Sequence, residues 1–381
     1  MRALFMKSCM VFAATVCLLS WQGGAVLFGQ DFSNPVGFVK FESPANTDMR
    51  ISAPVHRPSV YRGNVTNVSG NVLTLATANF TAGQLIYNGT SQLDHFYVRV
   101  ASGTAAGAWY SITGHTSDTL TVSPATTLNL SERGLAATTG IDEILIIPHW
   151  TLNTIFPDQA GIVTSPDPFA PSGTRVMMIP PSLTGPNLGP TEVFIYHDGS
   201  SGFIAAGWYN VANLFVGTYD HAPLAPDDHL IMRNRSSQLQ THYISGDAPS
   251  TKISTDLLRL ATTTNDNHVI QPYPVPLTVD ELDLVQNGIF TPSSNPFAPL
   301  GDLLLRFPSP PPTGTNLTPT KTYMYYDGSM GFLPQGWYDI GAPFGGSVDT
   351  SLVLGPGEVI VIRRPAGIAQ LDPWTLDLPY P

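Results

Sequence analysis

The chain has 381 residues with few charges and many glycines and prolines. Only 12% of the residues are charged, and 34 Gly and 35 Pro are present. Globular proteins usually carry about 25% charged residues, so this composition fits an exported β protein with long loops. The 43% apolar content is too high for a disordered chain. The formal net charge of −11 excludes a nucleic-acid partner, because such binding needs Lys and Arg to neutralise phosphates.

The first thirty residues have the pattern of an export signal. Arg2 and Lys7 supply positive charge, an apolar run covers 11–19, and small residues follow before Asp31. The run is shorter than the ~20 apolar residues of a membrane span. We expect residues 1–30 to be a signal peptide, and the mature chain to be extracellular, on the cell surface or periplasmic, without a transmembrane segment.

Both cysteines, Cys9 and Cys17, lie in this segment, so a mature chain without it would contain neither a disulfide nor a thiol. A lipid anchor on Cys17 is the alternative, but Val16 stands where such processing needs a small residue. Loss of the segment would leave 15 basic residues against 28 acidic ones.

A region of short strands is predicted over 31–150. Two strand-like runs at 35–41 and 50–55 open it, and an alternating hairpin then turns at Ser69-Gly70. Further alternating runs predict a small antiparallel barrel or sandwich of about five strands over roughly 62–125. A mostly apolar run at 141–147 predicts a buried strand that leads into Trp150.

A β unit then occurs twice. The motif Tyr196-His197-Asp198-Gly199-Ser200, followed by Gly207-Trp208-Tyr209, returns as Tyr325-Tyr326-Asp327-Gly328-Ser329 and Gly336-Trp337-Tyr338. Proline-rich loops at 180–182 and 308–312 bound matching strands. The predicted fold is therefore all-β: a small antiparallel barrel or sandwich followed by two tandem copies of a β unit, at 151–260 and 261–381.

Two local features complete this prediction. Residues 276–285 predict a short helix, with Thr278 as its cap and Glu281 at the third position. The stretches that begin at Trp150 and Trp374 share the pattern Trp-Thr-Leu, which we interpret as a common end-of-unit element.

Four duplicated aromatic residues are candidate ligand-binding residues: Trp208, Tyr209, Trp337 and Tyr338. Their faces suit pyranose rings, and an exported protein meets polysaccharides. Large aromatic residues in strands are more often buried. We therefore expect core positions, with sugar platforms as the alternative.

Asp198 and Asp327 are candidate calcium ligands, but two carboxylates fall short of the several oxygen ligands of a Ca²⁺ site. Turn formation by Asp-Gly is the favoured interpretation.

Arg233 and Arg363 end apolar strands, where a guanidinium commonly holds loop carbonyls or a carboxylate. A substrate phosphate is the alternative ligand. No cofactor or metal is predicted.

Two histidine clusters are the local starting points for a metal site. They are Asn265-Asp266-Asn267-His268 and Asp227-Asp228-His229, and we interpret both as solvated loops. The sequence has no Gly-x-Ser-x-Gly, His-Glu-x-x-His or phosphate-binding loop motif, and no catalytic residue is predicted. A glycosidase carboxylate pair stays open, because such pairs converge in space rather than in sequence.

Several motifs resemble an uncharacterised paralogous family of exported proteins of verrucomicrobial bacteria. They are the Asn34-to-Val39 opening, the hairpin at 63–71, the pattern at 97–103, and the Asp-Gly-Ser, Gly-Trp-Tyr, Pro-Gly-Glu and Ile-Arg-Arg series. The resemblance covers almost the whole mature chain and implies secretion and β architecture, with no known activity. The first copy departs from it, with Asp227-Asp228-His229 where the second has Pro356-Gly357-Glu358.

We therefore expect a non-enzymatic exported protein that serves as a structural or adhesive component at the cell surface or outside it. A carbohydrate-binding module is the alternative, and a secreted glycan hydrolase is the third choice. The expected partners are extracellular polysaccharide or other surface proteins.

Overall fold

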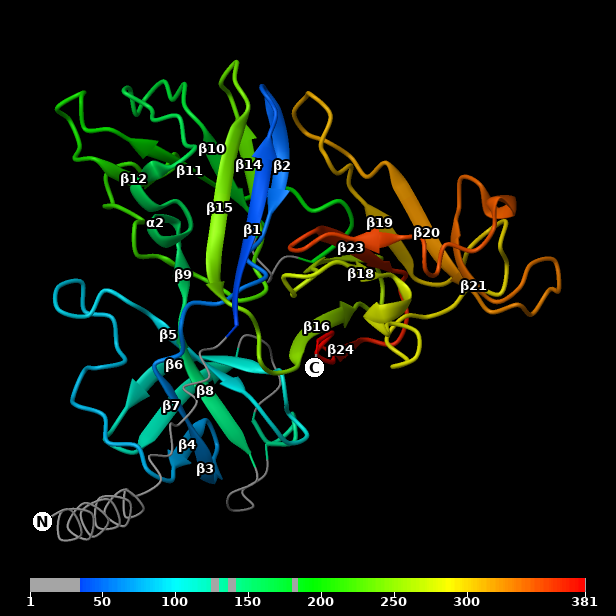
Figure 1. Ribbon diagram of the computed structural model, residues 1–381, viewed down its shortest axis with the longest axis horizontal. Helices are drawn as coiled ribbons and strands as arrows, with labels where there is room; N and C mark the ends of the chain where they lie inside the picture. Colours follow the sequence, from blue (N-terminus) through cyan, green and yellow to red (C-terminus); the bar gives the residue numbers. More distant parts are fainter. Residues whose placement is uncertain (1–34, 125–129, 136–141, 180–183, 381) are drawn as a thin grey trace, which may run out of the picture. The chain divides into compact units, whose positions relative to one another are not determined.

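The computed structural model describes residues 35–124, 130–135, 142–179 and 184–380. It is almost entirely β (Figure 1), which confirms the predicted fold class. The predicted signal peptide, both cysteines and the loop at 180–182 lie outside these residues. Within the described ranges, no helix is both long and apolar enough to cross a membrane.

Six antiparallel strands close a barrel. In order around the barrel they are β3 (Tyr61–Ser69), β4 (Val72–Leu75), β7 (Thr119–Pro124), β6 (Trp109–His115), β5 (Phe96–Val100) and β8 (Glu143–Pro148). The β3–β4 hairpin turns at Gly70, whose φ of +57° suits glycine. The apolar run at 141–147 contributes β8, which pairs with β3 and β5 and so closes the barrel.

Alternating side chains fill the barrel interior, among them the fully buried Leu73, Leu120 and Ile144. Strands β5 and β8 are buried on both faces. Tyr97 and Ile147 point away from the interior and form a second small cluster with Trp109. This explains why residues 144–147 are continuously apolar rather than alternating.

A five-stranded antiparallel sheet follows the order β12–β11–β10–β14–β2. Its strands are β12 (Gly207–Asn210), β11 (Glu192–His197), β10 (Arg175–Met178), β14 (Leu230–Asn234) and β2 (Thr47–Ile51). Two further pairs join β1 (Val36–Ser43) to β15 (Gln240–Asp247) and β9 (Trp150–Thr151) to β13 (Pro223–Leu224). Helix α2 (Leu152–Ile155) and a 3₁₀ turn (Pro157–Gln159) follow β9.

A second five-stranded sheet has the matching order β21–β20–β19–β23–β17. Its strands are β21 (Gly336–Asp339), β20 (Lys321–Tyr326), β19 (Leu303–Arg306), β23 (Val359–Arg364) and β17 (Asn265–Ile270). The further pairs are β16 (Ile253–Arg259) with β24 (Gln370–Leu376) and β18 (Leu277–Thr278) with β22 (Val353–Leu354). Two 3₁₀ turns cover Asp280–Leu282 and Pro343–Gly345.

The strand pairing shows where each β unit begins. Strands β1 and β2 pair with β15 and β14, so they belong to the first unit rather than to the barrel. We define copy 1 as 36–51 with 150–247 and copy 2 as 253–376. The barrel is inserted between β2 and β9 of copy 1, whereas 271–276 alone join β17 to β18 in copy 2.

Two sequence interpretations need correction. Trp150 lies in β9 and pairs with Leu224, whereas Trp374 lies in β24 and pairs with Thr255, so the two Trp-Thr-Leu stretches are not equivalent. The expected helix at 276–285 is only a single 3₁₀ turn. Its capping contacts do form, because the Thr278 hydroxyl donates to Glu281 at 2.9 Å and accepts from the Glu281 N–H at 3.3 Å.

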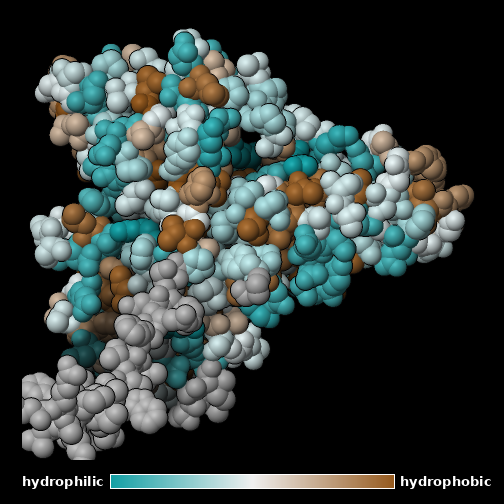
Figure 2. All heavy atoms as spheres, viewed as in Figure 1, coloured by the Kyte–Doolittle hydropathy of each residue, from teal (hydrophilic) through white to brown (hydrophobic). Residues whose placement is uncertain are grey.

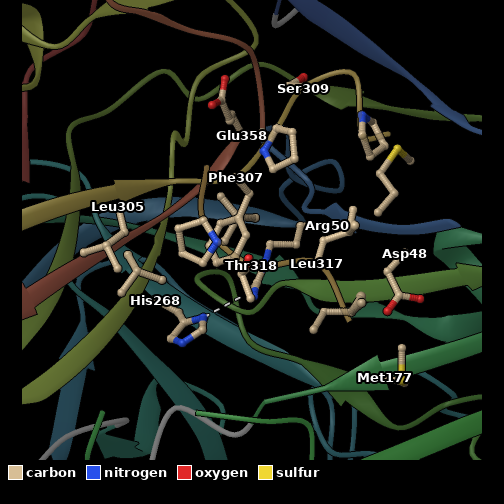
Figure 3. A pocket seen from close by; sticks show the side chains of 18 of the residues that line it. Asp48, Arg50, Met177, His268, Leu305, Phe307, Ser309, Leu317, Thr318 and Glu358 are labelled. Carbon is tan, nitrogen blue, oxygen red and sulfur yellow. Dashed lines mark hydrogen bonds between the residues drawn. The ribbon is translucent and has the colours of Figure 1, made fainter. Parts of the chain in front are cut away.

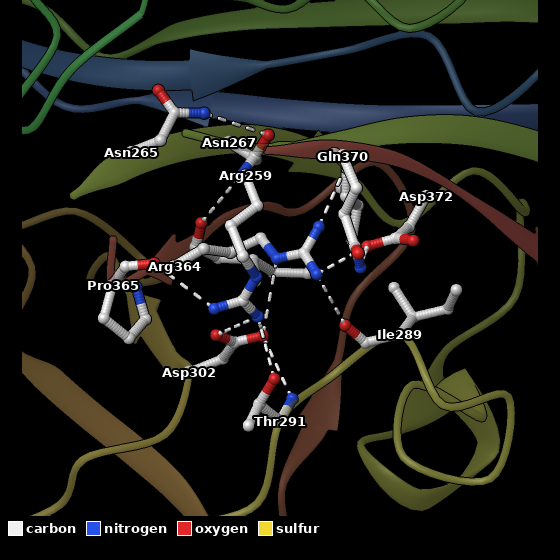
Figure 4. A network of polar contacts seen from close by, with 12 residues as sticks. Arg259, Asn265, Asn267, Ile289, Thr291, Asp302, Arg364, Pro365, Gln370 and Asp372 are labelled. Carbon is white, nitrogen blue, oxygen red and sulfur yellow. Dashed lines mark hydrogen bonds and ion pairs between the residues drawn. The ribbon is translucent and has the colours of Figure 1, made fainter. Parts of the chain in front are cut away.

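A buried ionic network holds β16, β23 and β24 of copy 2 together (Figure 4). Asp302 is fully buried and accepts from Arg259 Nη2 at 2.8 and 2.9 Å. Arg364 Nε lies 3.5 Å from the same carboxylate, and its Nη2 donates to Asp372 at 2.6 Å. Copy 1 has Thr174 and Asn234 at the positions of Asp302 and Arg364, so the network is specific to copy 2.

Candidate functional site

The four candidate sugar platforms are core residues. Trp208 and Trp337 are 0% and 1% exposed, and Tyr209 and Tyr338 are also buried. The backbone N–H of each Trp donates to an aspartate, Asp220 at 2.9 Å in copy 1 and Asp349 at 2.6 Å in copy 2. The expected core positions are confirmed, and no face of these rings is open to a sugar.

The Asp-Gly turns are also as expected. Asp198 Oδ1 accepts the Ser200 N–H at 2.9 Å, and Asp327 Oδ1 accepts the Ser329 N–H at the same distance. Hydrogen bonds from these serines lower the pKa of both carboxyls. Each is followed by a glycine with φ of +80°. Within the described residues, no group of three or more His, Asp or Glu side chains is placed to hold a metal ion.

Each copy exposes a cluster of three phenylalanines, which we call a tip. Tip 1 consists of Phe169, Phe203 and Phe215, exposed by 59%, 74% and 74%, and tip 2 of Phe297, Phe332 and Phe344, exposed by 52%, 62% and 73%. The ring centroid of Phe169, or of Phe297, lies 5.6–6.0 Å from those of the other two phenylalanines of its tip. Two rings of each tip lie on the loops that flank the outer edge strand, β12 or β21, and the third lies on the loop before β10 or β19. Figure 2 shows apolar side chains at the β21 end.

Arg233 and Arg363 hold carboxylates, as one interpretation expected, and they also join the two copies. Arg233 binds Asp48 with two hydrogen bonds of 2.7 and 2.8 Å and donates to Asn316 of copy 2 at 2.9 Å. Arg363 repeats this arrangement with Asp266 and with Asn187 of copy 1.

Each copy therefore extends a loop onto the other copy. The Asn316 N–H donates to Asp48 at 2.6 Å, and the Asn187 N–H donates to Asp266 at 2.5 Å. Both asparagines have φ of +56°, a left-handed conformation that asparagine tolerates. The reciprocal contacts have the self-complementary form of a two-fold interface within one chain.

A pocket of about 680 Å³ lies between the copies. Its lining comes from strands β1, β2, β10, β14, β17, β19 and β23 and from loops that include the two exchanged ones. Its apolar wall includes Met177, Leu305, Phe307 and Leu317 (Figure 3). Ile231 also belongs to this wall. Binding sites for small molecules are typically apolar clefts of about 300–1,000 Å³ with a few polar groups, and this pocket fits that description.

Arg50 reaches into this pocket from β2 (Figure 3). Its Nη1 lies 3.2 Å from His229 Nε2 and 3.3 Å from His268 Nδ1. The guanidinium carbon lies 3.6 Å from the centroid of the Phe307 ring, a cation–π geometry. The two imidazoles are stacked, with ring centroids 5.1 Å apart.

The pKa values follow from burial. Burial lowers the pKa of Arg50 to about 10. It also lowers the pKa of His268 to about 4 and that of His229 well below its usual value, and the Arg50 charge contributes to both shifts. The two imidazoles are therefore neutral at pH 7, and Arg50 carries the positive charge of this group.

The structure corrects the interpretation of both histidine clusters as solvated loops. Asn265 to His268 lies in β17, where Asn265 and Asp266 are buried, and His229 is buried as well. The match of Asp227-Asp228-His229 with Pro356-Gly357-Glu358 is also wrong by one residue. Asp228 accepts the Ala225 N–H as Glu358 accepts the Gly355 N–H, so Asp228 and Glu358 are counterparts.

Sequence reasoning missed Arg50, Phe307 and both tips. The sequence does hold a signal for the tips, since Phe169 and Phe203 recur as Phe297 and Phe332 within the duplicated motifs.

Comparison with protein-family models, with curated proteins and with solved structures finds no match.

Proposed function

We propose that the protein is an exported, non-enzymatic adhesive component that attaches to apolar patches of other surface proteins through its two tips. The observation that carries this proposal is that three phenylalanines at matching positions are exposed in each copy. Export is supported by the signal-like pattern of residues 1–30.

The clustering of the rings argues for contact with a partner. Scattered apolar residues are normal on a protein surface, whereas contiguous exposed patches mark interaction sites. Burial of a phenylalanine side chain contributes about 1.5–3 kcal/mol relative to exposure. One tip would give weak attachment after the cost of association, and two tips on one chain would raise the avidity.

A carbohydrate-binding module remains the alternative, but it would need rings other than the buried Trp208 and Trp337. A glycan hydrolase needs two carboxyl groups that face one site. The acidic residues that line the inter-copy pocket, Asp48, Asp266 and Glu358, are each engaged by an arginine. We therefore place adhesion first.

Retention on octyl-agarose tests the tips one at a time. Phe203→Ser with Phe215→Ser removes most of tip 1, and Phe332→Ser with Phe344→Ser removes most of tip 2. Each pair should weaken retention, and all four changes together should abolish it. The matched controls are Leu239→Ser and Ile368→Ser, because these side chains are 55% and 82% exposed but lie outside the tips.

Unchanged retention of the fourfold variant would overturn the proposal. Sedimentation equilibrium of the wild type separates two partners. A monomer at all concentrations supports attachment to other proteins, whereas dimers that are lost in the fourfold variant would make the tips contacts between copies of this chain.

A further inference from the structure

Arg50 differs from the other arginines that line the inter-copy pocket. In the described part of the chain these are Arg50, Arg233 and Arg363. Arg233 and Arg363 each form two hydrogen bonds to a carboxylate. Among the residues that the structure describes, Arg50 makes hydrogen bonds to His229 and His268, which are neutral at pH 7, and to no carboxylate.

The carboxylate nearest in sequence to Arg50 is already engaged. Asp48 accepts from Arg233 and from the Asn316 N–H. Asp48 acts on the Arg50 charge through space but forms no ion pair with it. A partly buried guanidinium that forms no ion pair with a described residue is costly, because burial removes its hydration. An anion that enters the pocket would restore this pairing, and guanidinium binds carboxylate and phosphate with two parallel hydrogen bonds.

The remaining wall of the pocket selects the rest of the ligand. Leu305, Phe307 and Leu317 from copy 2 and Met177 and Ile231 from copy 1 present apolar surface. The Phe307 ring also packs against the Arg50 guanidinium, 3.6 Å from its central carbon. A ligand with a charged head and an apolar body would satisfy both parts of the pocket.

We propose that the inter-copy pocket binds one amphiphilic organic anion per chain, with its carboxylate or phosphate head on Arg50 and its apolar body against Phe307 and Leu317. This site is separate from the tips and goes beyond the adhesive function.

A stoichiometry of one follows from the difference between the copies. The strand registers make His268 the counterpart of Arg50, and Val359 the counterpart of His229. The cationic group therefore occurs once, although the surrounding loops and ion pairs are duplicated.

Isothermal titration with octanoate, octyl phosphate, 1-octanol and sulfate tests the site at pH 7. Octanoate or octyl phosphate should bind with one site per chain, and Arg50→Gln should weaken that binding about tenfold or more, the loss expected for charge-assisted hydrogen bonds. 1-Octanol should bind more weakly, equally to wild type and variant. Arg62→Gln is the matched control, because Arg62 is an exposed arginine that pairs with Glu143 on the barrel.

Wild-type affinity of Arg50→Gln for both octyl anions, or failure of both to bind the wild type, would overturn the proposal. Sulfate binding as tight as octanoate would overturn the role of the apolar wall. If Arg50→Gln does not fold, NMR of the wild type decides. Octanoate should shift the imidazole resonances of His229 and His268 and leave those of His56 unchanged, and the absence of such selective shifts would count against the site.

Discussion

Asp302→Asn tests the buried ionic network of copy 2. Asp302 is 0% exposed, and two arginines contact its carboxylate. The substitution keeps the shape of the side chain but removes its charge. Arg364 would keep the carboxylate of Asp372, whereas Arg259 would lose its ion pair and keep neutral partners such as Thr291 and the Pro365 carbonyl.

The expected cost is large because the remaining charge is buried. Loss of one partner from a buried ion pair typically costs about 3–5 kcal/mol. The matched control is Asp339→Asn, which breaks the exposed pair with Lys321 and should cost no more than about 1 kcal/mol. Urea unfolding at pH 7, followed by circular dichroism, measures both changes.

A double variant identifies the cause. If the unpaired Arg259 charge is responsible, the double variant Arg259→Met with Asp302→Asn should lose clearly less free energy of unfolding than the two single variants lose in sum. The reasoning would be refuted if Asp302→Asn lowered the free energy of unfolding no more than Asp339→Asn does, or if the two single changes were additive.

Three further outcomes are expected. Trp208→Ala and Trp337→Ala should each lower the free energy of unfolding by about 3–5 kcal/mol, because both rings are core; variants that keep the wild-type melting temperature would contradict this. Burial lowers the pKa of His56, His149, His242 and His268 to about 4 in the folded protein. The same histidines have a pKa of about 6.5 in the unfolded chain, so the unfolded state binds more protons between these two values. Each histidine should therefore remove roughly 3 kcal/mol from the free energy of unfolding as pH falls from about 6.5 to 4. Burial raises the pKa of Asp228 to about 7, so its protonation stabilises the folded protein as pH falls and opposes the histidines. His242→Gln isolates one histidine. The free energy of unfolding of this variant in urea should depend on pH less steeply than that of the wild type, by one proton over that range, and an unchanged slope would refute the lowered pKa of His242. Intact mass of the protein from culture fluid or cell envelope should show a chain that starts between residues 26 and 31 and has no thiol, whereas a cytoplasmic chain that retains Met1 would contradict export.

Local patterns predicted much of this fold, and long-range pairing accounts for what they missed. The hairpin at Gly70, the Asp198-Gly199 turn and the buried Trp208 depend on neighbouring residues, so period and turn chemistry were sufficient. The membership of β1 and β2 in copy 1 depends on pairing with strands about 200 residues later, which no local pattern records.

The inter-copy site was beyond sequence reasoning for the same reason. Arg50, His229 and Phe307 come from three distant segments and meet only because the two sheets pack with exchanged loops. Exposure of the tips was also unreadable, since an apolar residue in a duplicated motif is more often a core residue.

Agglutination of octyl-coated latex beads tests the central claim, that one chain attaches through two equivalent tips. The wild type should coat the beads and bridge them. Variants that carry Phe203→Ser with Phe215→Ser, or Phe332→Ser with Phe344→Ser, should still coat the beads but no longer agglutinate them, and the fourfold variant should do neither. Agglutination by the two single-tip variants at the wild-type level would contradict the account.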